Sequence, residues 1–308
     1  MAARTPGLCV VAVPLLLAVA GCALSPLAKR TSAFATAATA TAKDTTAAYA
    51  LVEQTHNDTE LATMAANFDS DGFDPAKIQP FLPAEEMDAR RKILEGLTKY
   101  AETLAYVSGD EPMTEFDTQA RALGTSLTAL SKSDALGTFT QRAHVSQADL
   151  NLAATAIDAL GRALMERRRS RELPGILKQM QQPIEQICAL LEADIGEPET
   201  SGLRNQLRND YATERRKQIK FIRDNERTMS ASEKRAEIEA LPKLEAAAAA
   251  GDKTLAATQA ALKQMAATHT ALAASAGAKE SPAFHIMLAE LTHDGEQLHG
   301  FYAQMPAR

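Results

Sequence analysis

Hydrophobic side chains recur at intervals of three and four residues along most of the chain, a spacing that places them on one face of an α-helix. Four such stripes are clear, at residues 116, 120, 123, 127 and 130, at 150, 153, 157, 160 and 164, at 173, 177, 180, 184, 187 and 191, and at 284, 288, 291, 298, 302 and 305. We find no convincing stretch that alternates strictly between apolar and polar residues, as a half-buried strand would. The pattern therefore predicts an all-α protein.

Helix starts are marked by capping signals. Ser146 with Asp149 and Ser230 with Glu233 have the spacing of a capping box, and Ser281 precedes a proline at a first helical position. Together with the stripes, these signals predict eight helices, at residues 32–67, 84–107, 112–132, 146–171, 173–195, 199–228, 231–275 and 282–305.

The predicted helices at 32–67 and 231–275 are long and rich in Ala and Thr. Small side chains let helices approach closely but bury little apolar area each. We therefore expect an elongated antiparallel helical bundle with long, partly Ala-rich helices. Pro183 and Pro242 are expected to kink their helices, because proline lacks a backbone donor. A division of the bundle near 196–198, where the sequence is Gly-Glu-Pro, is left open.

The composition narrows the class of protein. The chain has 308 residues, a formal net charge of −6, 5% aromatic residues and no Trp. This negative net charge argues against a generic nucleic-acid binder, which would carry a strongly basic face. A mean hydropathy of −0.20 with interspersed charges excludes a multi-span membrane protein and a wholly disordered chain.

The first residues have the organisation of a secretory signal. Arg4 precedes an apolar run at 8–20, and small residues follow. As a helix this run would span about 20 Å, less than the roughly 30 Å hydrocarbon core of a membrane. The sequence that ends it, Val19-Ala20-Gly21-Cys22, resembles the lipobox of bacterial lipoproteins.

The resemblance implies a lipoprotein signal peptide at residues 1–21, cut before Cys22. In that family the cysteine thiol receives diacylglycerol and the new amino terminus is acylated. Several acyl chains anchor a protein stably, so membrane contact through Cys22 is expected. Because Ala23 follows the cysteine, the family's sorting rule implies the inner leaflet of the outer membrane, facing the periplasm. Residues 22–31 would then form a tether and 32–308 the bundle. The alternative is an ordinary secretory signal with an unmodified cysteine.

Cysteine usage agrees with this interpretation. Cys9 would leave with the signal and Cys22 would be lipidated, so Cys188 would be alone and no intramolecular disulfide could form. Cys188 lies in the apolar run 184–191, which predicts a small buried hydrophobic side chain rather than a nucleophile.

Three Glu-x-x-His pairs are candidate metal ligands: Glu53 with His56, Glu290 with His293, and Glu296 with His299. Residues three apart share a helix face, and carboxylate-bridged di-iron bundles use two such pairs with two further Glu. The two C-terminal pairs fall beside the apolar stripe of their helix rather than on it. A solvated or capping role is therefore the favoured interpretation, and a metal-binding bundle is the alternative.

The segment between the first two predicted helices has a partial calcium-loop pattern. Asn67, Asp69, Asp71 and Gly72 match positions 1, 3, 5 and 6 of such a loop, but Ile78 stands at position 12, where Glu is required. An Asp- and Gly-rich turn between helices explains the same residues.

Basic side chains cluster twice, at Arg167, Arg168, Arg169 and Arg171 and at Arg215, Arg216, Lys217, Lys220 and Arg223. Acidic residues are interleaved with both clusters, as on solvated helix faces. The alternative is contact with anionic envelope polymers or lipid head groups.

No phosphate-binding Gly loop, nucleophile elbow, His-Glu-x-x-His or Cys-x-x-Cys motif occurs in the sequence. The sequence therefore predicts a non-enzymatic lipoprotein without a cofactor, acting as a scaffold, spacer or partner-binding module for an envelope protein. A metal-binding bundle and a cell-wall enzyme with scattered carboxylates are the alternatives.

Overall fold

The computed structural model describes residues 25–67, 78–109, 114–142, 145–165, 172–278 and 281–304, together with 72, 74 and 76. Every regular element in these ranges is helical, which confirms the predicted all-α class. In chain order the elements are α1 (Pro26–Ala66), α3 (Ala84–Gly109), α4 (Thr114–Leu130), the 3-10 turn η2 (Asp134–Leu136), α5 (Gly137–Arg142), α6 (Gln147–Met165), α7 (Leu173–Ile195), α8 (Gly202–Asp224), α9 (Ala231–Ala274) and α10 (Pro282–Gln304).

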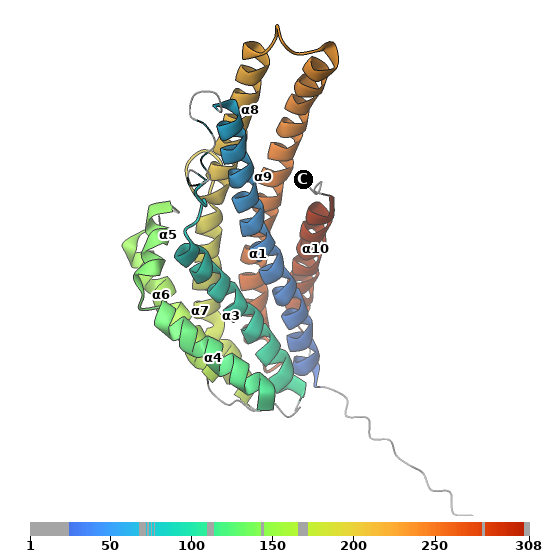
Figure 1. Ribbon diagram of the computed structural model, residues 1–308. Helices are drawn as coiled ribbons and strands as arrows, with labels where there is room; N and C mark the ends of the chain where they lie inside the picture. The colour runs from blue at the N-terminus through green and yellow to red at the C-terminus, as the bar shows by residue number, and fades with distance from the viewer. Residues whose placement is uncertain are drawn as a thin grey trace, which may run out of the picture.

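Two helices run along most of the bundle. Helix α1 has 41 residues and α9 has 44, which corresponds to roughly 60 Å or more for each. The two helices contact each other; α3 packs on α1, α7 packs on α9, and α8 and α10 contact both. Helix α4 packs on α6, which in turn packs on α7. The result is the expected elongated bundle of long helices (Figure 1).

Helix α1 begins at Pro26, earlier than the predicted boundary at residue 32. The Ser25 hydroxyl accepts a hydrogen bond from the Ala28 N–H at 3.1 Å and caps the helix. A proline at the first helical position is favourable because its missing N–H would have no partner inside the helix. Residues 26–31, which we assigned to the tether, are therefore helical. Pro26 thus starts this helix.

Arg30 joins the start of α1 to the end of α9. Its Nη2 group donates to the carbonyl oxygens of Ser275, at 3.1 Å, and Ala278, at 2.8 Å. These carbonyls lie at the C-terminal end of α9, where backbone acceptors lack helical partners and the helix dipole favours a cation. The first turn of α1 and the last turn of α9 are thus held together.

Two kinds of packing build the core. Between α6 and α7 the core is rich in Leu and Ile, as the stripes predict; Ile157, Leu160, Leu177 and Leu191 are fully buried. In α1 and α9, many buried positions hold Thr instead. The hydroxyl of each of these side chains donates to the carbonyl four residues earlier, which satisfies it inside its own helix: Thr41, Thr45, Thr254, Thr258 and Thr268.

Boundaries elsewhere depend on local backbone geometry. Helices α7, α9 and α10 match their predictions to within one residue, and α7 and α9 continue past their internal prolines. Helix α8 starts three residues late. Gly196 and Gly202 both have positive φ, 71° and 75°, and the chain turns back on itself between them. The short elements η2 and α5 carry no apolar stripe long enough to predict them.

Buried hydrophobic side chains on both sides of residues 196–198 belong to one core, which extends from Phe34 to Leu291. Phe284, Leu291 and Leu298 of the predicted C-terminal stripe are fully buried.

None of the described helices has the length and hydropathy that crossing a membrane would require.

Candidate functional site

Helices α8 and α9 form a hairpin that extends beyond the end of α1 (Figure 1). No residue between 212 and 243 is buried, and we call this outer part of the hairpin the arm. The arm lies at the end of the molecule opposite the start of α1 (Figure 1). It therefore presents two packed helices with exposed outer faces to the surroundings.

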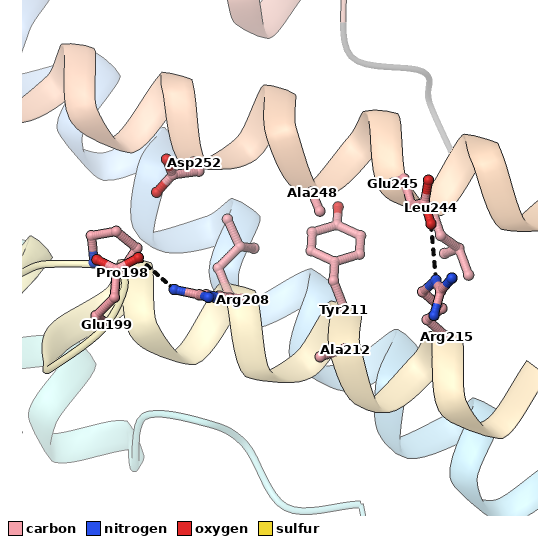
Figure 2. Close-up of a pocket in the computed structure, with 11 residues that line it drawn as sticks. Pro198, Glu199, Arg208, Tyr211, Ala212, Arg215, Leu244, Glu245, Ala248 and Asp252 are labelled. Atoms are coloured by element: carbon pink, nitrogen blue, oxygen red, sulfur yellow. Dashed lines mark hydrogen bonds and ion pairs between the residues drawn. The ribbon is translucent and has the colours of Figure 1, made fainter.

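A groove lies between α8 and α9 at the base of the arm, with a volume of about 390 Å³. Its floor is apolar and comprises Leu207, Tyr211, Leu244 and Ala248. Figure 2 shows the Tyr211 ring between the two helices, close to Ala248, with α1 behind them. Since α1 packs on both helices, it closes the rear of the hairpin and leaves this face open. We call this feature the α8–α9 groove.

Ion pairs form the walls of the α8–α9 groove. Arg208 Nη1 lies 2.6 Å from Glu199 Oε1, and Arg215 Nε lies 2.9 Å from Glu245 Oε1 (Figure 2). Beside the groove, Arg204 binds both carboxylate oxygens of Asp252, at 2.8 and 3.0 Å. The hydrogen bond to Asp252 raises the pKa of Arg204 above its usual value. Each of the three carboxylates is therefore engaged by an arginine.

This architecture can bind, but it is poorly suited to acid–base chemistry. General acids and bases need a proton-exchanging group with an adjusted pKa in reach of a substrate. The carboxylates of the groove are instead paired with guanidinium groups. An apolar floor with charged walls is typical of a surface that receives a helix from a partner.

The predicted pair Glu53 and His56 separates into two unrelated contacts. Glu53 Oε2 accepts a hydrogen bond from the Leu82 N–H at 3.2 Å, ahead of α3. His56 Nδ1 lies 3.2 Å from Asp210 Oδ2, which also links α1 to α8. Burial raises the pKa of Asp210, although hydrogen bonds from Gln206 and His56 oppose that change. Glu53 therefore connects α1 to the segment before α3, and His56 connects α1 to α8. The two side chains do not act together as ligands of one metal ion.

The C-terminal pairs lie on the exposed side of α10. Glu290 accepts a hydrogen bond from Gln264 at 2.9 Å, and His293 lies 2.8 Å from Gln297. Glu296 and His299 are exposed. Within the described ranges, no three His, Cys, Asp or Glu side chains converge in a way that could hold a metal ion.

Several predicted features lie outside the described residues. They are the lipobox with Cys22, the basic cluster at 167–171, and Asp69 and Asp71 of the calcium-loop pattern. Cys188 is fully buried and its thiol is free, as predicted for a small core side chain. Burial raises the pKa of this thiol well above its ordinary value, which keeps it protonated.

Two buried polar clusters could not be predicted from the sequence. Arg90, Asp194 and Tyr49 meet in the core from α3, α7 and α1. His269 is fully buried in α9, where its Nε2 lies 2.9 Å from the Tyr100 hydroxyl. The residues that these hydrogen bonds join are 104 to 169 positions apart along the chain, so no local pattern could have predicted the contacts.

Comparison of the chain with known protein families, with curated proteins and with solved structures finds no match. The function must therefore be inferred from the chemistry of the residues themselves. At the α8–α9 groove they provide an apolar floor, ion-paired walls and one open face.

Proposed function

We propose that this protein is a lipid-anchored envelope scaffold that holds a partner-binding arm at a fixed distance from the membrane. The anchor is Cys22 and the binding element is the α8–α9 hairpin. In this proposal the bundle is a spacer, and it performs no catalysis.

The observation that carries the proposal is the connection between the two ends of the molecule. Cys22 precedes the first turn of α1 by only a few residues in the sequence. Arg30 fastens that turn to the C-terminal end of α9, and the other end of α9 forms the arm. One helix of 44 residues therefore links the lipid-proximal end to the exposed end, across about 60 Å.

A metal-binding or enzymatic role has no comparable support. The Glu-x-x-His pairs make separate contacts, and the carboxylates beside the α8–α9 groove are paired with arginines.

Metabolic labelling with an alkyne-bearing palmitate tests the anchor. The wild-type chain should incorporate the label and remain in the membrane fraction in high salt, and Cys22→Ser should abolish incorporation. Cys9→Ser is the matched control, because it removes a cysteine from the signal without touching the lipobox, and its labelling should equal that of the wild type. Mass spectrometry of a mature protein with an unmodified thiol at position 22, or a mature start elsewhere, would refute the anchor.

A further inference from the structure

Apolar side chains of the arm lie in line with the α8–α9 groove. Residues spaced by seven lie on the same side of a helix, because seven residues make almost two turns. Two such sets flank the open face: Arg208, Arg215 and Ile222 on α8, and Asp252, Glu245 and Ile238 on α9. The ion pair between Arg215 and Glu245 shows that both sets lie on the same side of the hairpin. The two isoleucines therefore lie in line with the groove, toward the tip of the arm.

The apolar character of this face persists where solvent reaches it. Ile238 is 55% exposed, although it lies in line with the groove. A single exposed isoleucine is unremarkable in a folded protein. Ile238 stands between Glu237 and Glu239, in line with the apolar floor of the groove.

The arm is basic, in contrast to the acidic chain as a whole. Residues 212–243 contain nine Lys or Arg and six Asp or Glu, whereas the full chain has a net charge of −6. On α8, basic residues recur at the spacing of one helix face, at Arg216, Lys220 and Arg223. Lys220 pairs with Asp224. Arg216 and Arg223 of this row form no ion pair within the described ranges.

We infer that the α8–α9 groove binds an amphipathic helix of a partner protein, with apolar anchor side chains on one face and Asp or Glu on its flanks. The apolar floor accepts the anchors. Arg216, one helical turn from the groove-lining Ala212, begins the basic row of α8, which attracts the acidic flanks. An anionic polymer would leave the apolar floor unfilled. A second copy bound arm to arm would bring two basic surfaces together. The inference deepens the partner-binding part of the proposed function and does not depend on the lipid anchor.

Designed peptides test the chemistry directly. The acidic probe is an amphipathic helix of about four heptads with Leu at the core positions and Glu on the flanks; the basic probe has Lys in place of Glu. The protein is the mature chain with Cys22→Ser, which needs no detergent and leaves every described residue unchanged. The acidic probe should bind with a Kd of about 10 μM, at least about tenfold more tightly than the basic probe, and its binding should weaken as salt screens the arginines.

Two substitutions block the groove from opposite sides, Ala248→Arg on α9 and Ala212→Arg on α8. Both residues line the groove. Each should weaken binding of the acidic probe at least about tenfold. Because the new arginine would attract this probe, such a loss can only come from filling the groove. Ala246→Arg is the matched control, at an exposed position of α9 outside the groove, and should bind like the parent chain.

Equal binding of both probes, no binding, or binding unaffected by the two groove variants would overturn the inference. A chain that is dimeric in analytical ultracentrifugation and becomes monomeric with Ala248→Arg would identify a second copy as the occupant instead. If Arg216→Glu with Arg223→Glu abolished binding while both groove variants retained it, the site would be the basic row alone. The labelling of Cys22 is measured separately, so failure of the anchor and failure of the groove are distinguishable.

Discussion

Arg90 and Asp194 form a two-point ion pair in the centre of the bundle. Arg90 Nε donates to Asp194 Oδ2 at 2.7 Å, and Nη2 donates to Oδ1 at 2.6 Å. The Tyr49 hydroxyl donates to the same carboxylate at 2.6 Å, and the guanidinium lies 4.2 Å from the centre of the Phe139 ring. Both charged side chains are 1% exposed. Burial opposes the charged form of Arg90, but Asp194, together with Tyr49 and Glu86, more than offsets this and raises the pKa of Arg90.

We expect Asp194→Ala to lower the free energy of unfolding by about 3–5 kcal/mol, because it leaves a buried guanidinium with only the longer contact to Glu86, at 3.8 Å. Guanidinium chloride denaturation followed by circular dichroism measures this change. Arg235→Ala is the control, since that side chain is 81% exposed beside Glu239 and should change stability by less than about 0.5 kcal/mol. If both variants had the same small effect, the buried pair would not organise the core.

Replacing both members of the pair by apolar residues gives a second check. Arg90→Met with Asp194→Leu removes the two charges together and leaves neither uncompensated. We expect this double variant to recover much of the stability that Asp194→Ala loses.

His269 makes stability dependent on pH. Burial lowers its pKa to about 4, compared with about 6.5 for an unfolded histidine. Between these values the unfolded chain binds a proton at this residue and the folded chain does not. Stability should therefore fall as the pH decreases from 6.5 to 4, by up to about 3 kcal/mol from this residue.

Unfolding curves at several pH values between 4 and 7 measure the effect. His269→Gln keeps a polar partner for the Tyr100 hydroxyl but cannot titrate, so its stability should decline less steeply toward pH 4. His293→Gln, at an exposed position of α10, should follow the wild-type pH dependence. Parallel curves for all three proteins would show that His269 titrates normally in the folded state.

The sequence predicts those parts of the fold that depend on neighbours along the chain. The spacing of Phe284, Leu291 and Leu298 predicts the buried face of α10, and all three are fully buried. The capping box at Ser230 predicts where α9 begins. The wrong start of α1 is also local, because a proline both ends helices and begins them, and Ser25 decides which occurs.

Contacts between distant helices cannot be predicted in this way. Asp194 stands in the sequence as one acid near a helix end, and nothing nearby indicates that Arg90 will face it. Arg215 belongs to a basic cluster that we interpreted as a solvated face. Its pairing with Glu245, which forms one wall of the α8–α9 groove, depends on the alignment of two antiparallel helices. A single sequence does not specify that alignment locally.

Helices α4 and α6 approach so closely that two glycines face each other. A Cβ atom at Gly161 would lie 2.7 Å from the Gly124 carbonyl oxygen and 2.8 Å from Thr128 Oγ1. Alanine ordinarily stabilises a helix interior by about 0.5–1 kcal/mol relative to glycine. Here the clash with backbone outweighs that gain.

Gly161→Ala should therefore lower the free energy of unfolding by about 1–3 kcal/mol. Gly295→Ala on α10, where a Cβ meets no atom within 4 Å, should raise it by about 0.5–1 kcal/mol. Urea denaturation of both variants measures the two changes in the free energy of unfolding, which should have opposite signs. Stabilisation by Gly161→Ala would mean that α4 and α6 lie further apart than described.

The arm depends on local interactions because it contains no buried side chain. At its tip, the Glu233 N–H donates to the Ser230 hydroxyl at 3.3 Å, and the Ser230 N–H donates to Glu233 Oε2 at 2.7 Å. These hydrogen bonds also lower the pKa of Glu233. At the start of α8, in contrast, the Ser201 side chain makes no capping hydrogen bond.

Ser230→Ala should therefore loosen the first turn of α9 without weakening the bundle. We expect amide hydrogen exchange at residues 231–234 to accelerate about fivefold, as for the loss of a typical N-cap. The midpoint of global unfolding should not move, because this turn contributes nothing to the core. Ser201→Ala is the matched control and should leave exchange at the start of α8 unchanged. If Ser230→Ala shifted the global midpoint instead, the arm would unfold together with the bundle rather than separately from it.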